Sequence, residues 1–172
     1  MNEKNQHLEL AKTLSDQFSQ IPQVTAVAIS GSVAAGNQAP GSDIDLYVFT
    51  TEMLPLELRQ EIVQSRGASR ADLDLHFWDP GDEWFDAPTG IEVDVMYWDP
   101  RWIEDQIDQV LIHHQPSMGY TTATWHTIRN AKILFDRTGW LAALHNKSQS
   151  PYPQPLQVAI LTKNYPILRD VI

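Results

Sequence analysis

The central stretch of the chain reads VTAVAISGSVAAGNQAPGSDIDL and spans residues 24–46. Its first part, residues 24–30, is short, rich in β-branched residues and followed by a glycine, which predicts a buried strand. Polar and apolar residues then alternate over residues 43–50, which predicts a second strand. Because side chains two positions apart lie on the same face of a strand, Asp43 and Asp45 are expected to point to the same side.

The surrounding segments alternate between helical and extended patterns. Apolar residues at three- and four-residue spacing predict helices over residues 3–20 and 54–64. Strict alternation predicts further strands over residues 71–78 and 91–98, whereas residues 79–90, with two prolines and two glycines, are predicted to form a loop. Strands separated by helices indicate an α+β (α/β-like) fold with a mixed sheet of about four to five strands, flanked and followed by helices.

The chain after Pro100 is predominantly helical in pattern. Residues 148–155 contain three prolines, which predicts a linker. This linker would divide the chain into a main domain over residues 1–147 and a helical segment over residues 156–172. Because the segment stops without a capping signal, we expect it to be the start of a truncated C-terminal helical domain.

Composition excludes several classes of protein. The 172 residues carry a formal charge of −10 and contain no cysteine. The absence of thiols excludes disulfides and thiolate zinc sites, and the negative charge argues against binding of a nucleic acid polymer. The sequence has no apolar stretch of membrane-spanning length and no signal-peptide pattern, so we expect a cytoplasmic protein without membrane contact.

Acidic residues are concentrated in one part of the chain. Residues 72–108 contain twelve acidic residues and a single basic one, Arg101. Such a run is typical of a solvated face. It is equally typical of a surface that attracts cations, either metal ions or a positively charged small molecule, and the composition leaves both interpretations open.

Three aspartates form a candidate metal site. Two carboxylates on one side of a strand, as expected for Asp43 and Asp45, repel each other unless a positive charge lies between them. A hard divalent cation such as Mg²⁺ meets that need with carboxylate oxygens, substrate phosphates and water. A third carboxylate, Asp94 on the strand over residues 91–98, would complete a site for two ions, as used in displacement at phosphorus.

A small-residue turn supplies the complementary half of such a site. Gly31 would let the backbone approach phosphate oxygens, the Ser32 hydroxyl can hydrogen-bond them, and the N-terminus of a following helix offers free N–H donors. The metal ions and this turn would therefore bracket a triphosphate. Taken singly, neither motif is specific.

The combined pattern resembles the signature of the nucleotidyltransferase superfamily that shares the polymerase β catalytic core. The matching residues are Gly31-Ser32, nine intervening residues, Ser42-Asp43-Ile44-Asp45-Leu46, and Asp94. The resemblance extends over about residues 20–140 and is greatest to antibiotic (aminoglycoside- or lincosamide-type) nucleotidyltransferases and their uncharacterised bacterial relatives. It implies a polymerase β-like fold for residues 1–147, with two Mg²⁺ ions as cofactors and ATP or another nucleoside triphosphate as substrate.

The resemblance also implies roles for individual residues. The implied roles are metal binding for Asp43 and Asp45, metal bridging or base catalysis for Asp94, and nucleotide binding for Gly31, Ser32 and Ser42. Glu92 shares the predicted strand face of Asp94 and is a second candidate base, or else an ordinary solvent-facing residue. A second Asp-x-Asp, Asp72 and Asp74, has no Gly-Ser turn at a matching distance upstream and is not assigned to the site.

One position departs from the family pattern. Many relatives carry an arginine a few residues after the Gly-Ser pair, where this chain has Ala34, Ala35 and Gly36. If that arginine steadies the phosphates, another cation has to replace it. Arg129, Lys132 and Lys163 are the candidates, although each is more typical of an ordinary surface cation.

The sequence thus predicts a metal-dependent nucleotidyltransferase. It would move a nucleoside monophosphate, AMP from ATP, onto a hydroxyl of a small, cationic acceptor such as an aminoglycoside and release pyrophosphate. One alternative is an antitoxin-like adenylyltransferase acting on a tyrosine or serine of a partner protein. The other is a non-catalytic nucleotide-binding module. Whether the protein binds a protein partner or forms a homodimer stays open.

Overall fold

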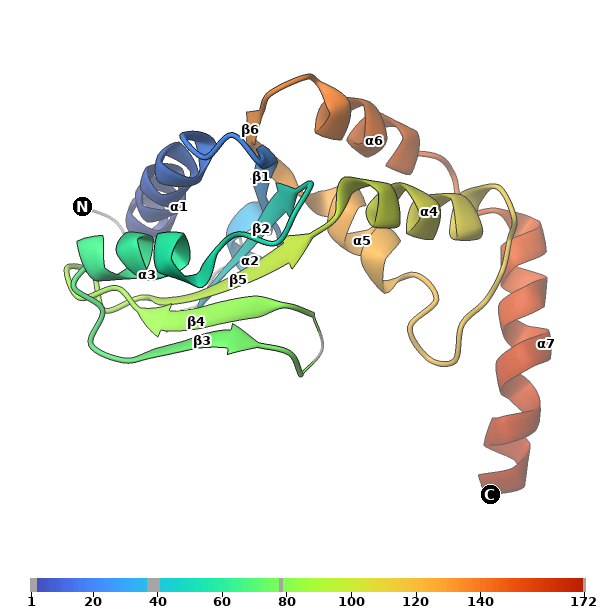
Figure 1. The fold of residues 1–172 in the computed structure, drawn as a ribbon. Helices are drawn as coiled ribbons and strands as arrows, with labels where there is room; N and C mark the ends of the chain where they lie inside the picture. Colours follow the sequence, from blue (N-terminus) through green and yellow to red (C-terminus); the bar gives the residue numbers. More distant parts are fainter. Residues whose placement is uncertain (1–2, 37–40, 78, 172) are drawn as a thin grey trace.

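A computed structural model of the protein describes residues 3–36, 41–77 and 79–171 (Figure 1). Six strands form one sheet: β1 (Val24–Ile29), β2 (Ile44–Thr50), β3 (Ala71–Leu75), β4 (Gly81–Phe85), β5 (Glu92–Trp98) and β6 (Lys132–Asp136). The helices are α1 (Glu3–Ser19), α2 (Gly31–Ala35), α3 (Leu56–Ser65), α4 (Pro100–Leu111), α5 (Ala123–Asn130), α6 (Trp140–Ser148) and α7 (Gln154–Val171). The predicted α+β class is confirmed.

The strands lie in the order β3-β4-β5-β2-β1-β6. Strands β2 and β5 are parallel, whereas the other neighbouring pairs are antiparallel. A parallel pair cannot be joined by a hairpin, and here the connection consists of α3, β3 and β4. The parallel register places Asp45 of β2 opposite Asp94 of β5.

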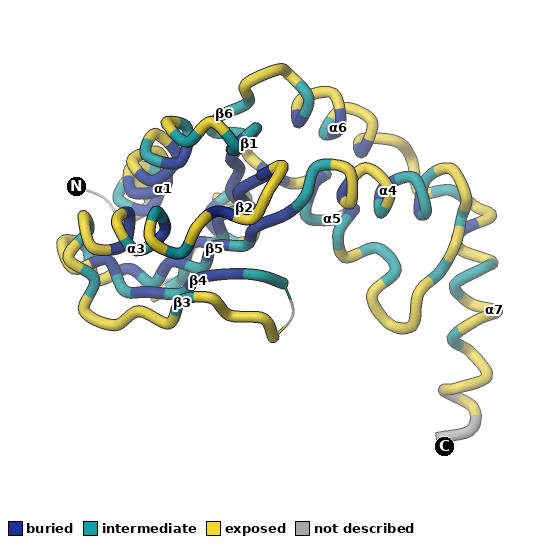
Figure 2. The backbone as a smooth tube through the Cα atoms, viewed as in Figure 1, coloured by how far each residue is buried: buried dark blue, intermediate teal, exposed yellow. Residues whose placement is uncertain are grey.

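Two hydrophobic clusters cover the two faces of the sheet, whose central strands are buried (Figure 2). Helices α1 and α3 pack on one face, where the strands alternate as their sequences predict, with Leu46 and Val95 pointing inward. The apolar stripes of α4, α5 and α6 pack on the other face. This second cluster includes Phe49 and Trp98 from the ends of β2 and β5, so the beginnings of both strands lie outside it.

Helix α4 shows how the local sequence sets an element boundary. The Asp99 side chain accepts hydrogen bonds from the backbone N–H groups of Arg101 (2.8 Å) and Trp102 (3.1 Å), and Pro100 occupies the first turn. A capping carboxylate and an early proline both favour the start of a helix. The chain therefore turns directly from β5 into the helix that packs under Trp98.

Strand β4 corrects the sequence-based prediction, because it lies within the segment that was expected to be a loop. Its polar residue Asp82 is fully buried and binds the guanidinium of Arg59 on α3 (2.7 Å) and the hydroxyl of Tyr97 on β5 (2.7 Å). A buried carboxylate is tolerated when it is paired in this way. The charge at Asp82 disguised β4 in the sequence. The predicted number of four to five strands was therefore too low, and the sheet has six.

Helix α7 follows α6 after a short connection and extends away from the sheet (Figure 1). It is continuous through Pro166. Its Leu156 is buried in the second cluster, whereas most of its later residues are exposed (Figure 2). Within the described residues, no helix combines the length and the apolar character that crossing a membrane requires.

Candidate functional site

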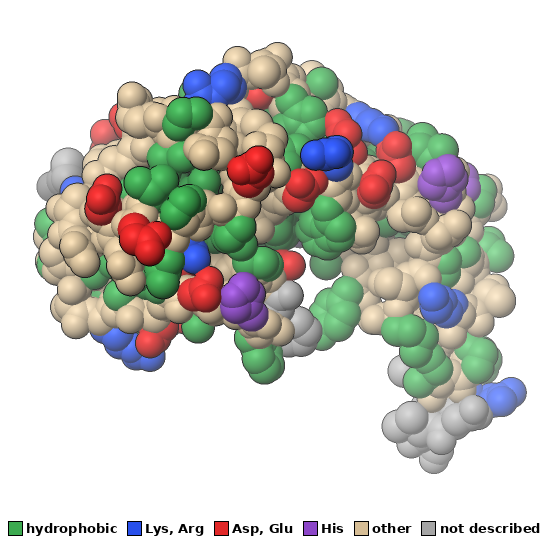
Figure 3. All heavy atoms as spheres, viewed as in Figure 1, with side chains coloured by type: hydrophobic (Ala, Val, Ile, Leu, Met, Phe, Trp, Pro, Cys, Tyr) green, Lys and Arg blue, Asp and Glu red, His purple; other side chains and the backbone are tan. Residues whose placement is uncertain are grey.

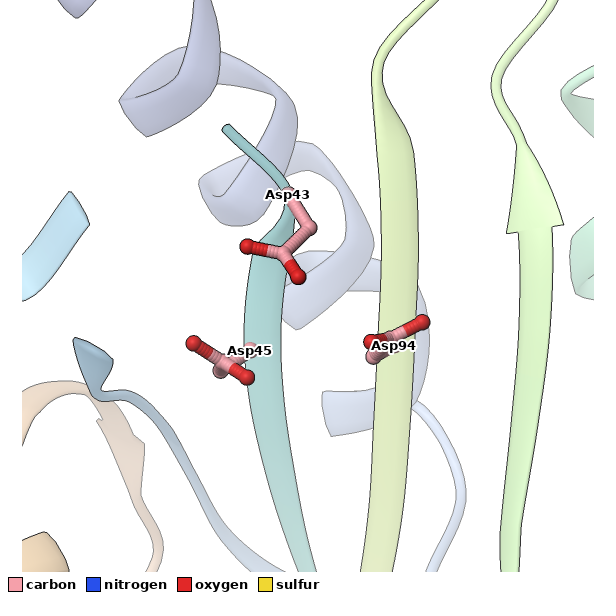
Figure 4. Close-up of side chains that lie close together, drawn as sticks. All are labelled: Asp43, Asp45 and Asp94. Atoms are coloured by element: carbon pink, nitrogen blue, oxygen red, sulfur yellow. The ribbon is translucent and has the colours of Figure 1, made fainter. Parts of the chain in front are cut away.

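Three aspartates from two neighbouring strands come together on the sheet (Figure 4). Asp43 immediately precedes β2, Asp45 lies within β2, and Asp94 lies within β5. One carboxylate oxygen of each residue lies within 4.8 Å of the others. The structure thus places side by side the three residues for which the sequence predicted a metal site.

The electrostatics of this triad are unfavourable without a cation. Burial, followed by the charges of Glu83, Asp43 and Asp45, raises the pKa of Asp94 from 3.8 to about 6. Burial and the charge of Asp43 also raise the pKa of Asp45. The Oδ1 atom of Asp94 is buried and has no hydrogen-bond partner within the described part of the chain. Hard oxygen ligands with unsatisfied negative charge fit a divalent cation such as Mg²⁺.

Gly31 holds the Gly-Ser turn close to the triad. Its φ of +64° belongs to the left-handed region, and a Cβ atom here would lie 2.1 Å from Oδ2 of Asp45. The adjacent Ser30 N–H donates to the carbonyl of Asp45 at 3.2 Å. Only glycine therefore allows the turn to approach Asp45 this closely.

The two serines predicted to bind nucleotide flank the triad. Ser32 is half-buried at the second position of α2, next to Gly31. Ser42 directly precedes Asp43, and its carbonyl accepts a hydrogen bond from Nε2 of His7 on α1 at 2.9 Å. This bond anchors the chain just before the first aspartate of the triad.

Glu92 and Glu83 extend the acidic site toward β4. The pKa of Glu92 is raised by burial and by a hydrogen bond and charge interaction with Glu83. Glu83 lies directly opposite Asp94 in the β4–β5 pairing. Sequence reasoning missed Glu83 because it placed this segment in a loop. Its neighbours Asp82 and Trp84 are both buried, but the charge of Asp82 hides this alternation in the sequence.

The second Asp-x-Asp does not form a second metal site among the described residues. Asp72 lies opposite Glu83 in the sheet and pairs with Arg70 at 3.5 Å. The β3–β4 register shifts after Asp72, and Asp74 has a φ of +61°. Asp74 instead accepts a hydrogen bond from Arg59 at 2.9 Å, which lowers its pKa.

The acidic run over residues 72–108 divides into groups with different roles. Asp82 and Asp86 are buried and pair with arginines of α3 and its C-terminal cap. Glu104 and Asp105 are exposed on α4, and acidic side chains are scattered over the face of the molecule drawn in Figure 3. The interpretation as a solvated face thus holds for α4. Asp94, in contrast, belongs to the triad, and Glu83 and Glu92 lie beside it.

The candidate replacements for the family arginine come from three different elements, α5, β6 and α7. Arg129 donates to the carbonyls of Ser148 (3.2 Å), at the end of α6, and Ser150 (2.7 Å), just after it. Lys163 of α7 donates to the carbonyl of Pro116 at 2.6 Å. Lys132 is exposed on the edge strand β6, where it lies opposite Ile29 at the end of β1 that leads into the Gly-Ser turn. Two of the three are thus already bonded to backbone carbonyls.

We expect Asp94→Asn to stabilise the metal-free protein at pH 7.5. The raised pKa means that the folded state favours protonated Asp94. The contribution of this protonated side chain to the free energy of unfolding is full below about pH 4 and is lost as the pH rises through about 6. A pKa raised from 3.8 to about 6 corresponds to about 3 kcal/mol, which screening at this partly exposed site reduces to about 1–2 kcal/mol. Thermal unfolding in EDTA should show a larger gain at pH 7.5 than at pH 4.5, and an equal or lower Tm for the variant at pH 7.5 would contradict this account.

A family match agrees with the geometry of the site. A profile of the nucleotidyltransferase domain matches residues 9–115, more than half of the chain. No curated protein sequence matches. Among solved structures, the Cid1 poly(U) polymerase is similar at 18% identity and a TM-score of 0.47, over 61% of this chain and 33% of that chain. A toxin–antitoxin structure with AMP-PNP is similar at 17% identity and a TM-score of 0.46, over 93% of this chain and 97% of that chain.

The chain spans only about one third of the length of the Cid1 structure. The family match, in contrast, includes the Gly-Ser turn and all three aspartates of the triad. The predicted superfamily is confirmed, whereas the activity and the finer resemblance to antibiotic-modifying enzymes stay predictions. The chain belongs to the nucleotidyltransferase domain family.

Proposed function

We propose that this nucleotidyltransferase moves AMP from ATP onto a hydroxyl of a small, cationic acceptor. The observation that carries the proposal is the convergence of Asp43, Asp45 and Asp94 beside the Gly31 turn. In the reaction, the acceptor oxygen forms a bond to the α-phosphorus and the bond between this phosphorus and the bridging oxygen breaks. Pyrophosphate leaves, and the acceptor proton passes to a carboxylate.

The triad would hold two Mg²⁺ ions through its carboxylate oxygens. When bound, such ions neutralise charge on the α-phosphate and on the leaving pyrophosphate. The orphaned Oδ1 of Asp94 and the mutual repulsion of the three carboxylates support this assignment. Beside Asp45, the backbone at Gly31 and the Ser32 hydroxyl would hold the nucleotide phosphates, together with Ser42 next to Asp43.

Two carboxylates are candidates for the base that accepts the acceptor proton. Asp94 lies at the metal site itself, whereas Glu92 lies beside it and interacts with Glu83. A carboxylate whose pKa is raised toward neutrality is a more effective base than one with an ordinary pKa. Both residues meet this condition in the metal-free protein.

The acceptor is proposed to be a cation because acidic residues surround the triad. The charges of Glu83 and Glu92 both act on Asp94, and the chain as a whole carries a charge of −10. A field of this sign attracts cationic substrates and disfavours anionic ones.

Incubation with ATP, Mg²⁺ and a panel of amine-bearing alcohols, aminoglycosides among them, tests this function. Mass spectrometry should show an acceptor that has gained AMP, and a coupled assay should show stoichiometric pyrophosphate. Other nucleoside triphosphates serve as competitors to establish the base preference. Failure to release pyrophosphate with any acceptor, in either Mg²⁺ or Mn²⁺, would count against the proposal, and AMP on a co-purified protein would redirect it to a protein acceptor.

A further inference from the structure

A cavity of about 290 Å³ opens next to the triad, over β4 and the end of β3. Its lining includes Leu75, Phe77, Asp79, Glu83, Asp94 and Met96. Asp94 therefore belongs both to the triad and to the wall of this cavity. Any molecule in the cavity would lie beside the atoms that the proposed reaction uses.

The order of elements across the sheet separates two sides of the triad. Gly31 follows β1 and lies against Asp45, whereas Glu83 lies opposite Asp94 on β4. In Figure 4, the Asp94 carboxylate lies across β5, with one oxygen toward β2 and the other toward β4. If the triphosphate takes the Gly31 side, the β4 side is left for the group that attacks from the opposite direction, as in-line displacement requires.

The chemistry of the lining selects a cation with a carbon skeleton. Asp79, Glu83 and Asp94 contribute carboxylates, and no Lys, Arg or His is among the described lining residues. Phe77, whose side chain is 85% exposed, and Met96 contribute apolar surface. An ammonium group gains from nearby carboxylates and from an aromatic face, whereas an anion or a carboxylate would be repelled.

The β4–β5 register sets a distance between the two polar contacts of an acceptor. Glu83 and Asp94 are directly opposite on antiparallel strands, so their Cβ atoms are about 5 Å apart. A hydroxyl at Asp94 and an ammonium at Glu83 would then be a few bonds apart, as in a 1,2- or 1,3-amino alcohol. The cavity volume lies at the lower end for ligand pockets, so a single ring fits.

The geometry points to this cavity as the acceptor site, which takes a 1,2- or 1,3-amino alcohol and recognises its ammonium through Glu83. This inference rests on the proposed function and adds the position and the class of the acceptor. Glu83 acts as a specificity residue, and Phe77 packs against the carbon skeleton. An acceptor with several rings would insert one amino-bearing ring and leave the others outside.

The test compares amine-bearing probes with their neutral counterparts. Glucosamine and 2-deoxystreptamine are assayed against their N-acetylated forms, with ATP and Mg²⁺, for the wild type and for Glu83→Gln. We expect the wild type to prefer the amines and Glu83→Gln to raise the acceptor KM at least tenfold, with the KM for ATP unchanged. The preference for the amine over the N-acetyl form should also disappear.

Matched variants keep the test decisive. Asp72→Asn removes the next carboxylate along the sheet, outside the cavity, and should leave both KM values unchanged. Phe77→Ala, at an exposed position, should raise the acceptor KM about threefold to tenfold without affecting Tm. An unchanged acceptor KM and amine preference in both Glu83→Gln and Phe77→Ala would overturn the assignment. So would a wild type that binds Mg·ATP but adenylates none of the amines.

Failure of this inference can be distinguished from failure of the proposed function. Calorimetry measures binding of Mg·ATP by the wild type and by Asp43→Asn. Equal binding by both proteins would defeat the metal site itself. Weaker binding by Asp43→Asn, together with unchanged amine preference in Glu83→Gln, would defeat only the acceptor site.

Discussion

Replacing Asp45 by asparagine should lower kcat/KM for nucleotidyl transfer by about 1,000-fold. Asp45 lies between the Gly31 turn and the other two aspartates, so its carboxylate is the one that can act on both the metal ions and the region of the phosphates. Loss of a group that stabilises charge at the reacting phosphorus costs about 100- to 1,000-fold, and loss of metal affinity adds to this. Steady-state rates of pyrophosphate release over a range of Mg²⁺ concentrations measure the effect.

The same substitution should not harm the fold. Burial and the charge of Asp43 raise the pKa of Asp45, so a neutral side chain relieves repulsion in the metal-free protein. The matched control is Asp72→Asn, which neutralises an exposed carboxylate on the same sheet outside the triad. Comparable losses of activity in the two variants would show that the triad is not the metal site, and a much lower Tm for Asp45→Asn would show that the fold depends on this carboxylate.

Gly31→Ala is expected to lower kcat/KM by at least about 100-fold and to weaken binding of Mg·ATP. The new Cβ atom would lie 2.1 Å from Oδ2 of Asp45, so the turn or the carboxylate has to move. Displacement of about 1 Å at a reacting centre is enough for an effect of this size. Activity assays and calorimetry with Mg·ATP, each compared with the wild type, measure the two changes.

Gly36→Ala provides an unusually close control for this substitution. Gly36 also has a left-handed φ, +69°, but a Cβ atom there would have no described heavy atom within 4 Å. Both variants therefore have a similar backbone strain of about 1 kcal/mol, and only Gly31→Ala creates a clash with the triad. If both variants lose activity to the same extent, backbone strain and not the approach to Asp45 is responsible.

The sequence was sufficient to predict the triad because its members follow strand periodicity. Asp43 and Asp45 alternate with apolar residues on one strand, and Asp94 does the same on another. Periodicity assigns each aspartate to a polar face, and the repulsion of like charges predicted a shared metal site. Their parallel pairing and register, Asp45 opposite Asp94, became visible only in the structure.

Strand β4 and the site residue Glu83 could not be predicted in the same way. The buried Asp82 is paired with Arg59, 23 residues earlier in the chain, which reaches it from α3. Such a long-range ion pair leaves no periodic signal, and the prolines and glycines around β4 favoured a loop. The candidate acceptor cavity is lined by residues of this strand, so sequence patterns could not predict its location.

The parallel pairing of β2 with β5 also has a consequence for folding. The two strands are joined by more than forty residues, so they meet only after a long stretch of chain has been organised. The repulsion among Asp43, Asp45 and Asp94 arises only when this pairing forms, and a divalent ion that binds the triad acts on the native state alone. Such an ion is therefore expected to slow unfolding more than it accelerates refolding.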